Sequence, residues 1–119
     1  MRFDRFTTKL QQALADAQSL AVGRDNAYIE PQHLLLALLD QQDGGAASLL
    51  SRAGVNVQPL REALRASIHR LPKLEGHAGE VNISRELNNV LNLTDKEAEK
   101  RGDQYIETEL FLLARTDDR

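Results

Sequence analysis

Apolar residues recur at helical spacing along most of this chain, most clearly over residues 28–39. The leucines of this stretch form one wide apolar face, as on the buried side of a helix. They are Leu34, Leu35, Leu38 and Leu39. Pro31 suits the first turn, because the N–H that proline lacks would have no partner there, and Glu30 places negative charge at the positive end of the helix dipole. The pattern predicts a helix that begins near Pro31 and ends near Leu39 or Asp40.

The same spacing, together with its interruptions, predicts five more helices. Gly23 and Gly54 follow apolar stripes and are expected to end helices. Asp4 and Asn56 are expected to cap the helices that follow them. With the stretch above, the predicted helices cover about Asp4–Val22, Pro31–Asp40, Ala46–Ala53, Asn56–Leu71 and Ser84–Arg101, and a sixth begins near Thr108. The expected core stripe of the fifth helix is Leu87, Val90, Leu91, Thr94 and Ala98.

The chain repeats itself at a constant offset without a gap. Residues 28–37 return in weaker form as residues 105–114, and the same offset pairs Leu10 with Leu87. Such self-similarity is the sequence signature of repeated structural units. It predicts two copies of one helical unit.

The predicted fold class is therefore all-α, with two pseudo-symmetric four-helix repeats. Repeat 1 covers residues 1–71. Residues 72–83 contain a proline and two glycines without any period, and we expect them to form a linker. Repeat 2 covers residues 84–119. It is expected to be incomplete, because the counterparts of the third and fourth helices would begin only after residue 119.

Composition narrows the classes of function. Aromatic residues make up only 4% of the chain, so the core must consist mainly of aliphatic side chains, which favours helices over sheets. The net charge of −3 argues against a general nucleic-acid binder, which needs a basic face. The absence of cysteine excludes disulfides and thiolate metal sites. We find no signal peptide or membrane span in the sequence and expect a cytoplasmic protein.

The sequence offers no catalytic, metal or nucleotide site. It lacks the Gly-x4-Gly-Lys-Ser/Thr loop that cradles phosphates, so we expect the chain to bind no ATP and to be no enzyme. His33 follows Glu30 by three residues, but His69 and His77 stand at no ligand-like spacing from it. We therefore interpret His33 as a helix-surface or capping histidine.

Two stretches carry a family resemblance. Residues 13–21 (Ala-Leu-Ala-Asp-Ala-Gln-Ser-Leu-Ala) and residues 29–39 (Ile-Glu-Pro-Gln-His-Leu-Leu-Leu-Ala-Leu-Leu) resemble the Clp amino-terminal repeat. In that family an alanine-rich helix precedes a helix of the Glu-x-x-His-Leu-Leu-x-Ala-Leu-Leu type. The start Met1–Thr7 and the segment Lys100–Asp103 look closest to the ClpB group, the AAA+ disaggregase chaperones. The resemblance covers nearly the whole chain.

The resemblance implies a non-enzymatic domain that recruits substrates, tethered to ATPase modules that hold ATP and magnesium outside this fragment. The parent protein would be a homohexamer of the heat-shock response that works with a co-chaperone of the DnaK type. Its partners would be unfolded or aggregated proteins, not nucleic acid or membrane. An alternative stays open, the adaptor-docking domain of a protease-coupled Clp unfoldase. That function would need a larger and more polar surface.

The binding-site hypothesis starts from two positions at which the repeats differ. Leu93 stands where repeat 1 has Asp16, and Leu110 stands where it has His33. Because Leu93 lies off the predicted core stripe, we expect it to face outward or into a cleft, where exposed apolar residues can bind apolar segments of another chain. The alternative is that both leucines pack on the absent last helices or on the other repeat.

Three polar residues complete the predicted site. Asp103 and Glu109 come from the connection after the fifth helix and would contact the backbone or basic side chains of a bound segment. Thr7 would approach from the start of the first helix. The alternative is that both residues have structural roles only. Asp103 would then stabilise a turn, and Glu109 would interact favourably with the helix dipole from the first turn. The family resemblance makes these matching positions the first candidates. The predicted substrate-binding residues are Thr7, Leu93, Asp103, Glu109 and Leu110.

Overall fold

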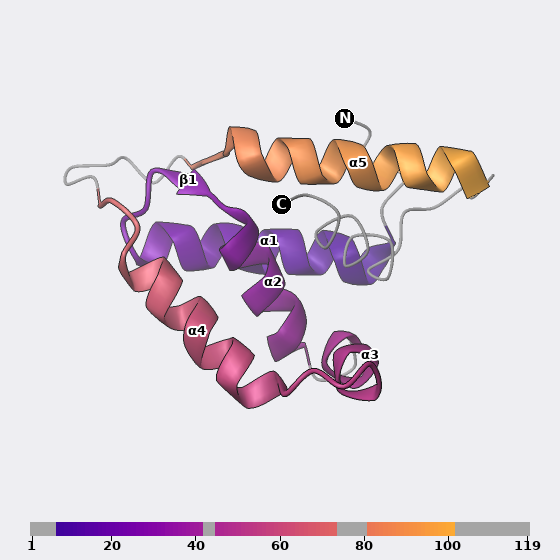
Figure 1. Ribbon diagram of the computed structural model, residues 1–119. Coiled ribbons are helices and arrows are strands. Elements are labelled where there is room, and N and C mark those ends of the chain that lie inside the picture. Colours follow the sequence, from indigo (N-terminus) through magenta and orange to yellow (C-terminus); the bar gives the residue numbers. More distant parts are fainter. Residues whose placement is uncertain (1–6, 42–44, 74–80, 102–119) are drawn as a thin grey trace.

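The structure is a computed structural model and describes residues 7–41, 45–73 and 81–101, with side chains to residue 96 (Figure 1). Five helices dominate these residues, and the all-α prediction is confirmed. The elements are α1 (Thr8–Gly23), β1 (Tyr28–Ile29), α2 (Pro31–Asp40), α3 (Ala46–Arg52), α4 (Val57–His69), β2 (Asn82–Ile83) and α5 (Arg85–Arg101). None of the helices in this described part of the chain has the length and apolarity needed to cross a lipid bilayer.

Helix α1 begins four residues later than predicted. Thr7 has extended backbone angles, and its hydroxyl oxygen accepts a hydrogen bond from the backbone N–H of Leu10 at 3.4 Å. Threonine is a strong N-cap residue because its side chain satisfies a backbone donor that the helix leaves free. The predicted start at Asp4 is therefore wrong, since the capping signal of Thr7 prevails. The buried face of α1 consists of Leu10, Ala13, Ala17 and Ala21.

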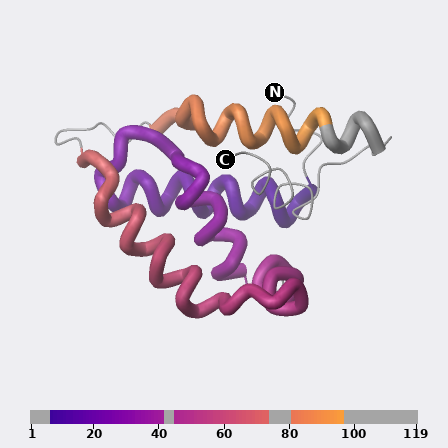
Figure 2. The backbone as a smooth tube through the Cα atoms, in the orientation of Figure 1, coloured from indigo at the N-terminus to yellow at the C-terminus, as the bar shows by residue number. Residues whose placement is uncertain are grey.

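Helix α2 keeps its predicted bounds and is buried on more sides than predicted. It contacts α1, α3, α4 and α5. Leu34 and Leu38 are fully buried, and Leu36, which the predicted apolar face omitted, is buried as well. Leu35, predicted to be core, is only half-buried. A helix enclosed by several neighbours loses the one-sided pattern of a surface helix, because apolar contact is available almost all round it. Figure 2 shows the path of the chain, with α4 and α5 on opposite sides of α2 in this view.

Helices α3 and α4 close the other side of α2. Leu64 and Ile68 of α4 are buried, while Leu60 and Leu71 are half-buried against the same core. Asn56 occupies the N-cap position of α4 as predicted, although its side chain makes no capping hydrogen bond. The turn between α3 and α4 uses Gly54 at a φ of 90°, a backbone conformation that glycine adopts without strain.

The predicted linker contains a strand that the sequence did not reveal. Residues 82–83 pair in parallel with residues 28–29, so that Tyr28 faces Asn82 and Ile29 faces Ile83. The N–H of Ser84 extends the pairing to the carbonyl of Ile29 at 3.0 Å. Strands of two residues are too short for an alternating pattern to be recognised in a sequence. The pairing connects the residues that precede α5 to the residues that precede α2.

Helix α5 begins in the same way as α1, at the offset of the sequence repeat. Ser84 takes the place of Thr7, and its hydroxyl oxygen accepts a hydrogen bond from the N–H of Leu87 at 3.0 Å. Leu10 and Leu87 correspond at the same offset, and both are fully buried. The predicted stripe of α5 is buried at Leu87, Val90, Leu91 and Thr94, and its last member, Ala98, lies outside the residues whose side chains are described. These matches fit the proposed repeat for the first helix of each unit. The predicted sixth helix lies outside the described residues.

Candidate functional site

Leu93 lies on α5 with much of its side chain open to solvent. It is 38% exposed, whereas Leu91 and Thr94 close to it in the sequence are fully buried. The orientation agrees with the expectation that Leu93 lies off the core stripe. A leucine held outward in this way can contact another chain, as can the similarly exposed Val22, Tyr28 and Val55.

Of the other four predicted site residues, Thr7 lies within the described part of the chain. Thr7 is half-buried, and its hydroxyl oxygen is engaged with Leu10 at the N-terminus of α1. Its position therefore has a structural reason of its own. Asp103, Glu109 and Leu110 lie outside the described residues. Of the two predicted site residues that the structure describes, Leu93 is the one with an exposed side chain.

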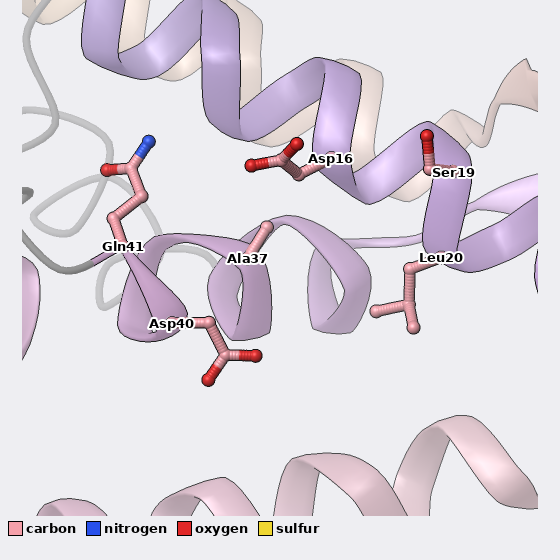
Figure 3. A pocket seen from close by; sticks show the side chains of 6 residues that line it. All are labelled: Asp16, Ser19, Leu20, Ala37, Asp40 and Gln41. Atoms are coloured by element: carbon pink, nitrogen blue, oxygen red, sulfur yellow. The ribbon is translucent and has the colours of Figure 1, made fainter.

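A cleft of about 460 Å³ opens at a different place, between α1 and the end of α2 (Figure 3). It includes neither Thr7 nor Leu93. Three lining residues come from α1, two come from α2, and one is the residue that follows α2. They are Asp16, Ser19, Leu20, Ala37, Asp40 and Gln41. The half-buried Leu20 and the buried Ala37 give the cleft apolar walls, and the other four residues surround them with oxygen-bearing side chains.

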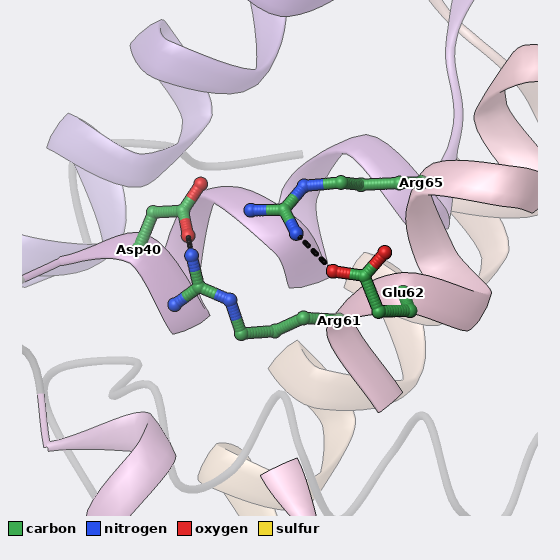
Figure 4. A network of polar contacts seen from close by, with 4 residues as sticks. All are labelled: Asp40, Arg61, Glu62 and Arg65. Carbon is green, nitrogen blue, oxygen red and sulfur yellow. Dashed lines mark hydrogen bonds and ion pairs between the residues drawn. The ribbon is translucent and has the colours of Figure 1, made fainter. Parts of the chain in front are cut away.

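The two carboxylates of the cleft have different partners. Asp40 forms an ion pair with Arg61 of α4 at 2.6 Å, and a second pair on α4 joins Arg65 to Glu62 at 2.7 Å (Figure 4). Asp16 accepts a hydrogen bond from the neutral amide of Gln12 at 3.1 Å. Among the described residues, Asp16 therefore has a neutral partner, whereas Asp40 has a cationic one.

Gln41 is the C-cap residue of α2 and joins the end of this helix to the start of α1. Its Nε2 donates a hydrogen bond to the backbone carbonyl of Lys9 at 2.8 Å. Its Oε1 is buried and accepts no hydrogen bond from the described residues. An unsatisfied buried acceptor is unfavourable. Because this oxygen has less than 1 Å² of accessible surface, it does not open onto the cleft.

His33 is a buried capping residue. Its Nδ1 accepts a hydrogen bond from the backbone N–H of Glu30 at 2.8 Å, which closes the first turn of α2. The capping part of the prediction is confirmed, and the surface part is wrong, because the imidazole is fully buried. Burial and, second, the nearby charge of Arg24 lower the pKa of His33 to about 4. Within the described residues no three His, Asp or Glu side chains gather as a metal site would require.

The acidic cleft could not be predicted from the sequence, although one of its residues, Asp16, entered the binding-site hypothesis. In that hypothesis Asp16 was considered only as the residue of repeat 1 that corresponds to Leu93. Asp40, the second carboxylate, was considered only as a possible last residue of α2. Their proximity depends on how α1 crosses α2, which the spacing of residues within each helix does not determine.

Comparison with known proteins identifies relatives over the whole chain. Residues 5–119 match the family described as the Clp repeat (R) N-terminal domain. "Chaperone protein ClpB" of Vibrio cholerae is 50% identical over 119 residues, which are all of this chain and 14% of that protein. The chain thus spans about one seventh of the length of this relative.

Two solved structures share the fold. The Hsp104 N-terminal domain of Candida albicans is 23% identical, with a TM-score of 0.84, over 95% of this chain and 74% of that one. The N-terminal domain of the ClpV1 ATPase from the E. coli EAEC Sci1 T6SS is 26% identical, with a TM-score of 0.89, over 98% of this chain and 70% of that one. At so low an identity, the likeness to the Hsp104 domain shows the fold alone.

Proposed function

The chain belongs to the Clp repeat (R) N-terminal domain family, and on that premise we propose that it recruits substrates for a ClpB-type protein disaggregase. In this proposal the domain binds apolar segments that unfolded or aggregated proteins expose. The likeness to ClpB at 50% identity supports the choice of this branch of the family.

The observation that carries the proposal is the exposure of Leu93. Complete burial of a leucine side chain is worth roughly 1.5–3 kcal/mol, and covering the 38% that Leu93 exposes is worth correspondingly less. One such contact gives weak binding that tolerates many sequences. Weak and tolerant binding suits a domain that must accept many unfolded chains.

The remaining predicted residues would complete a groove around Leu93. We propose that Leu110 adds a second apolar contact. Thr7, Asp103 and Glu109 would contact the backbone or basic side chains of the bound segment. The half-buried position of Thr7 leaves part of its side chain within reach of a partner.

The rest of the protein would supply the energy. We propose that ATP and magnesium bind in ATPase modules outside this chain, that the parent protein forms a homohexamer in the cytoplasm, and that it works with a DnaK-type co-chaperone. The chain itself contains no phosphate-binding loop of the Gly-x4-Gly-Lys-Ser/Thr form.

The proposal is tested by binding of an unfolded protein to the full-length protein that carries this domain. Fluorescence anisotropy of labelled, reduced and carboxymethylated ribonuclease would measure the affinity. Leu93→Ser is expected to weaken binding several-fold. Val22→Ser is the matched control, because Val22 is also 38% exposed but lies at the end of α1. Equal affinity of the Leu93→Ser variant and the parent would refute the groove.

Docking of a folded adaptor is the second candidate function. The likeness to the ClpV1 domain shows that this fold is not confined to the ClpB group. A folded partner would bury about 1,200–2,000 Å² in total, so its binding would respond to substitutions far from Leu93 as well. If Val22→Ser and Leu93→Ser weakened the capture of a partner equally, this second function would be favoured.

A further inference from the structure

Residues 26–29, which join α1 to α2, contact two parts of the chain that lie far from them in the sequence. Asn26 forms an antiparallel bridge with Lys73, which follows α4. Strand β1 pairs in parallel with β2, which precedes α5. The connection between α4 and α5 therefore meets this one short segment soon after it leaves α4 and again just before it enters α5.

Two buried side chains link this segment to the first turn of α2. Nδ1 of His33 accepts a hydrogen bond from Glu30, so Nε2 carries the ring proton and donates it to Oδ1 of Asn26 at 2.9 Å. The amide nitrogen of Asn26 donates in turn to the carbonyl of Pro72 at 3.4 Å. His33 is fully buried and Asn26 is 2% exposed, so water does not compete for the bond between them.

This pair of side chains belongs to the first unit of the sequence repeat. Residues 28–30 return unchanged in the second unit, at the offset of the repeat. Asp103 stands there in place of Asn26, and Leu110 stands in place of His33. Leucine carries no donor, so these two residues cannot form the same bond. The pair is thus present in the unit from which the connection to α5 leaves, and the other unit lacks it.

We propose that His33 and Asn26 form a latch that secures both described ends of the connection between α4 and α5. The bond to His33 fixes Asn26, and Asn26 fixes Pro72 and the backbone that pairs with β2. The apolar core does not include either side chain of the latch. Opening of the latch would therefore release the connection while the helices stay packed on one another.

The latch has a consequence for the recruitment of substrates, and this consequence alone rests on the proposed function. Helix α5 begins directly after β2 and carries the exposed Leu93, so the latch also fixes where this leucine is presented. Leu93→Ser tests recruitment without touching the latch. The measurements below test the latch without a client protein, so the two proposals fail separately.

Hydrogen exchange followed by NMR on the full 119-residue chain tests both ends of the connection. The side-chain amide of Asn26 reports the contact with Pro72, and the backbone amide of Ser84 reports its bond to Ile29 at 3.0 Å. His33→Leu removes the donor to Asn26 and introduces the residue that the second unit has at this position. We expect both signals to exchange about five- to a hundredfold faster, because a buried acceptor is left without its donor.

Gln32→Ala is the matched control. Gln32 is the half-buried neighbour of His33 on α2, and its Nε2 donates a hydrogen bond to Ser67 of α4 at 3.0 Å. The substitution also removes a bond between two elements, but this bond does not involve residues 26–29. Exchange at Asn26 and Ser84 should then stay within about twofold of the parent, as for sites that share no partner. Equal acceleration by Gln32→Ala and His33→Leu would overturn the latch.

The amide of Ala17 separates opening of the latch from unfolding of the whole domain. Ala17 lies on the buried face of α1, so its exchange reports unfolding of that helix. Asn26 and Ser84 should exchange faster than Ala17 in the parent and in both variants. Equal rates at the three sites would show that only complete unfolding releases the connection. That result would overturn the proposal, as would unchanged exchange at Asn26 or Ser84 in His33→Leu.

The parent chain supplies a test that does not depend on the folding of any variant. If the latch and the strand pairing open together, the Nε2 proton of His33 and the amide of Ser84 should show equal protection from exchange. A ring proton that is protected far longer than the Ser84 amide would show that β1 and β2 separate while the latch stays closed. The proposal would then be wrong.

Discussion

The Nε2 atom of His33 lies 2.9 Å from Oδ1 of Asn26, and both side chains are buried. Because Nδ1 of His33 accepts a hydrogen bond from Glu30, the ring proton must reside on Nε2, which donates to Asn26. The amide nitrogen of Asn26 donates in turn to the carbonyl of Pro72 at 3.4 Å. This chain of bonds joins the first turn of α2 to residues that follow α4.

The buried hydrogen bonds of His33 require a neutral ring, so we expect the free energy of unfolding to decrease in mild acid. The pKa of His33 is about 4 in the folded protein and about 6.5 in an unfolded chain, so the unfolded state binds the proton first. Stability from this residue is complete above pH 6.5 and falls as the pH decreases to about 4. The total loss is at most about 3 kcal/mol. A second proton on His33 would also point two donors, Nδ1–H and the N–H of Glu30, at each other.

Urea unfolding between pH 7 and pH 4 checks this prediction against a His33→Gln variant, which cannot titrate at this position. Carboxylates elsewhere lose stability in acid in both proteins, so the difference between the two curves isolates His33. The free energy of unfolding of the parent should fall more steeply below pH 6.5. NMR titration of the His33 ring supplies an independent check, and a ring that titrates near its usual pKa of 6.5 would contradict the expected behaviour.

Asn26 is expected to matter for stability as much as a core residue. In Asn26→Ala the buried Nε2–H of His33 loses its acceptor, which costs about 1–3 kcal/mol. Asn88→Ala is a suitable control, because Asn88 is an exposed asparagine on α5 and its replacement should change stability by less than about 0.5 kcal/mol. Chemical unfolding at pH 7 measures both. Equal stabilities of the two variants would show that the His33–Asn26 bond contributes nothing.

The helices could be predicted from the sequence because their signals are local. Apolar spacing placed α2 within its observed bounds, and the serine at position 84 marked the start of α5. The start of α1 was misplaced, because Asp4 and Thr7 both carry a capping side chain and the prediction chose Asp4. Capping by Thr7 is decided by the hydrogen bond to Leu10, which only the folded backbone shows.

The features that could not be predicted from the sequence all depend on residues far apart in the chain. Strand β1 pairs with β2, which follows it only after three intervening helices, and neither strand is long enough to show a period. The contact between Asn26 and the carbonyl of Pro72 joins equally distant segments. The cleft at Asp16 depends on the crossing of α1 over α2. The outward position of Leu93 was predictable, because a residue off a helical stripe lies away from the face that the stripe buries.

The exposure of Leu93 leads to a prediction about stability that separates a binding surface from the core. Leu91 and Leu93 lie close together on α5, yet Leu91 is fully buried and Leu93 is 38% exposed. Leu91→Ala should cost about 2–5 kcal/mol, because it removes buried methyl groups and leaves a cavity. Leu93→Ser should cost no more than about 0.5 kcal/mol, as at other surface positions.

Urea unfolding of the full chain, followed by circular dichroism, compares the two variants with the parent. The two substitutions lie on one helix, so any general weakening of α5 would affect both alike. A large loss of stability in Leu93→Ser would show that this leucine packs against residues 102–119 or another part of the protein. In that case Leu93 would be a packing residue. The proposed groove would then lose the observation that supports it.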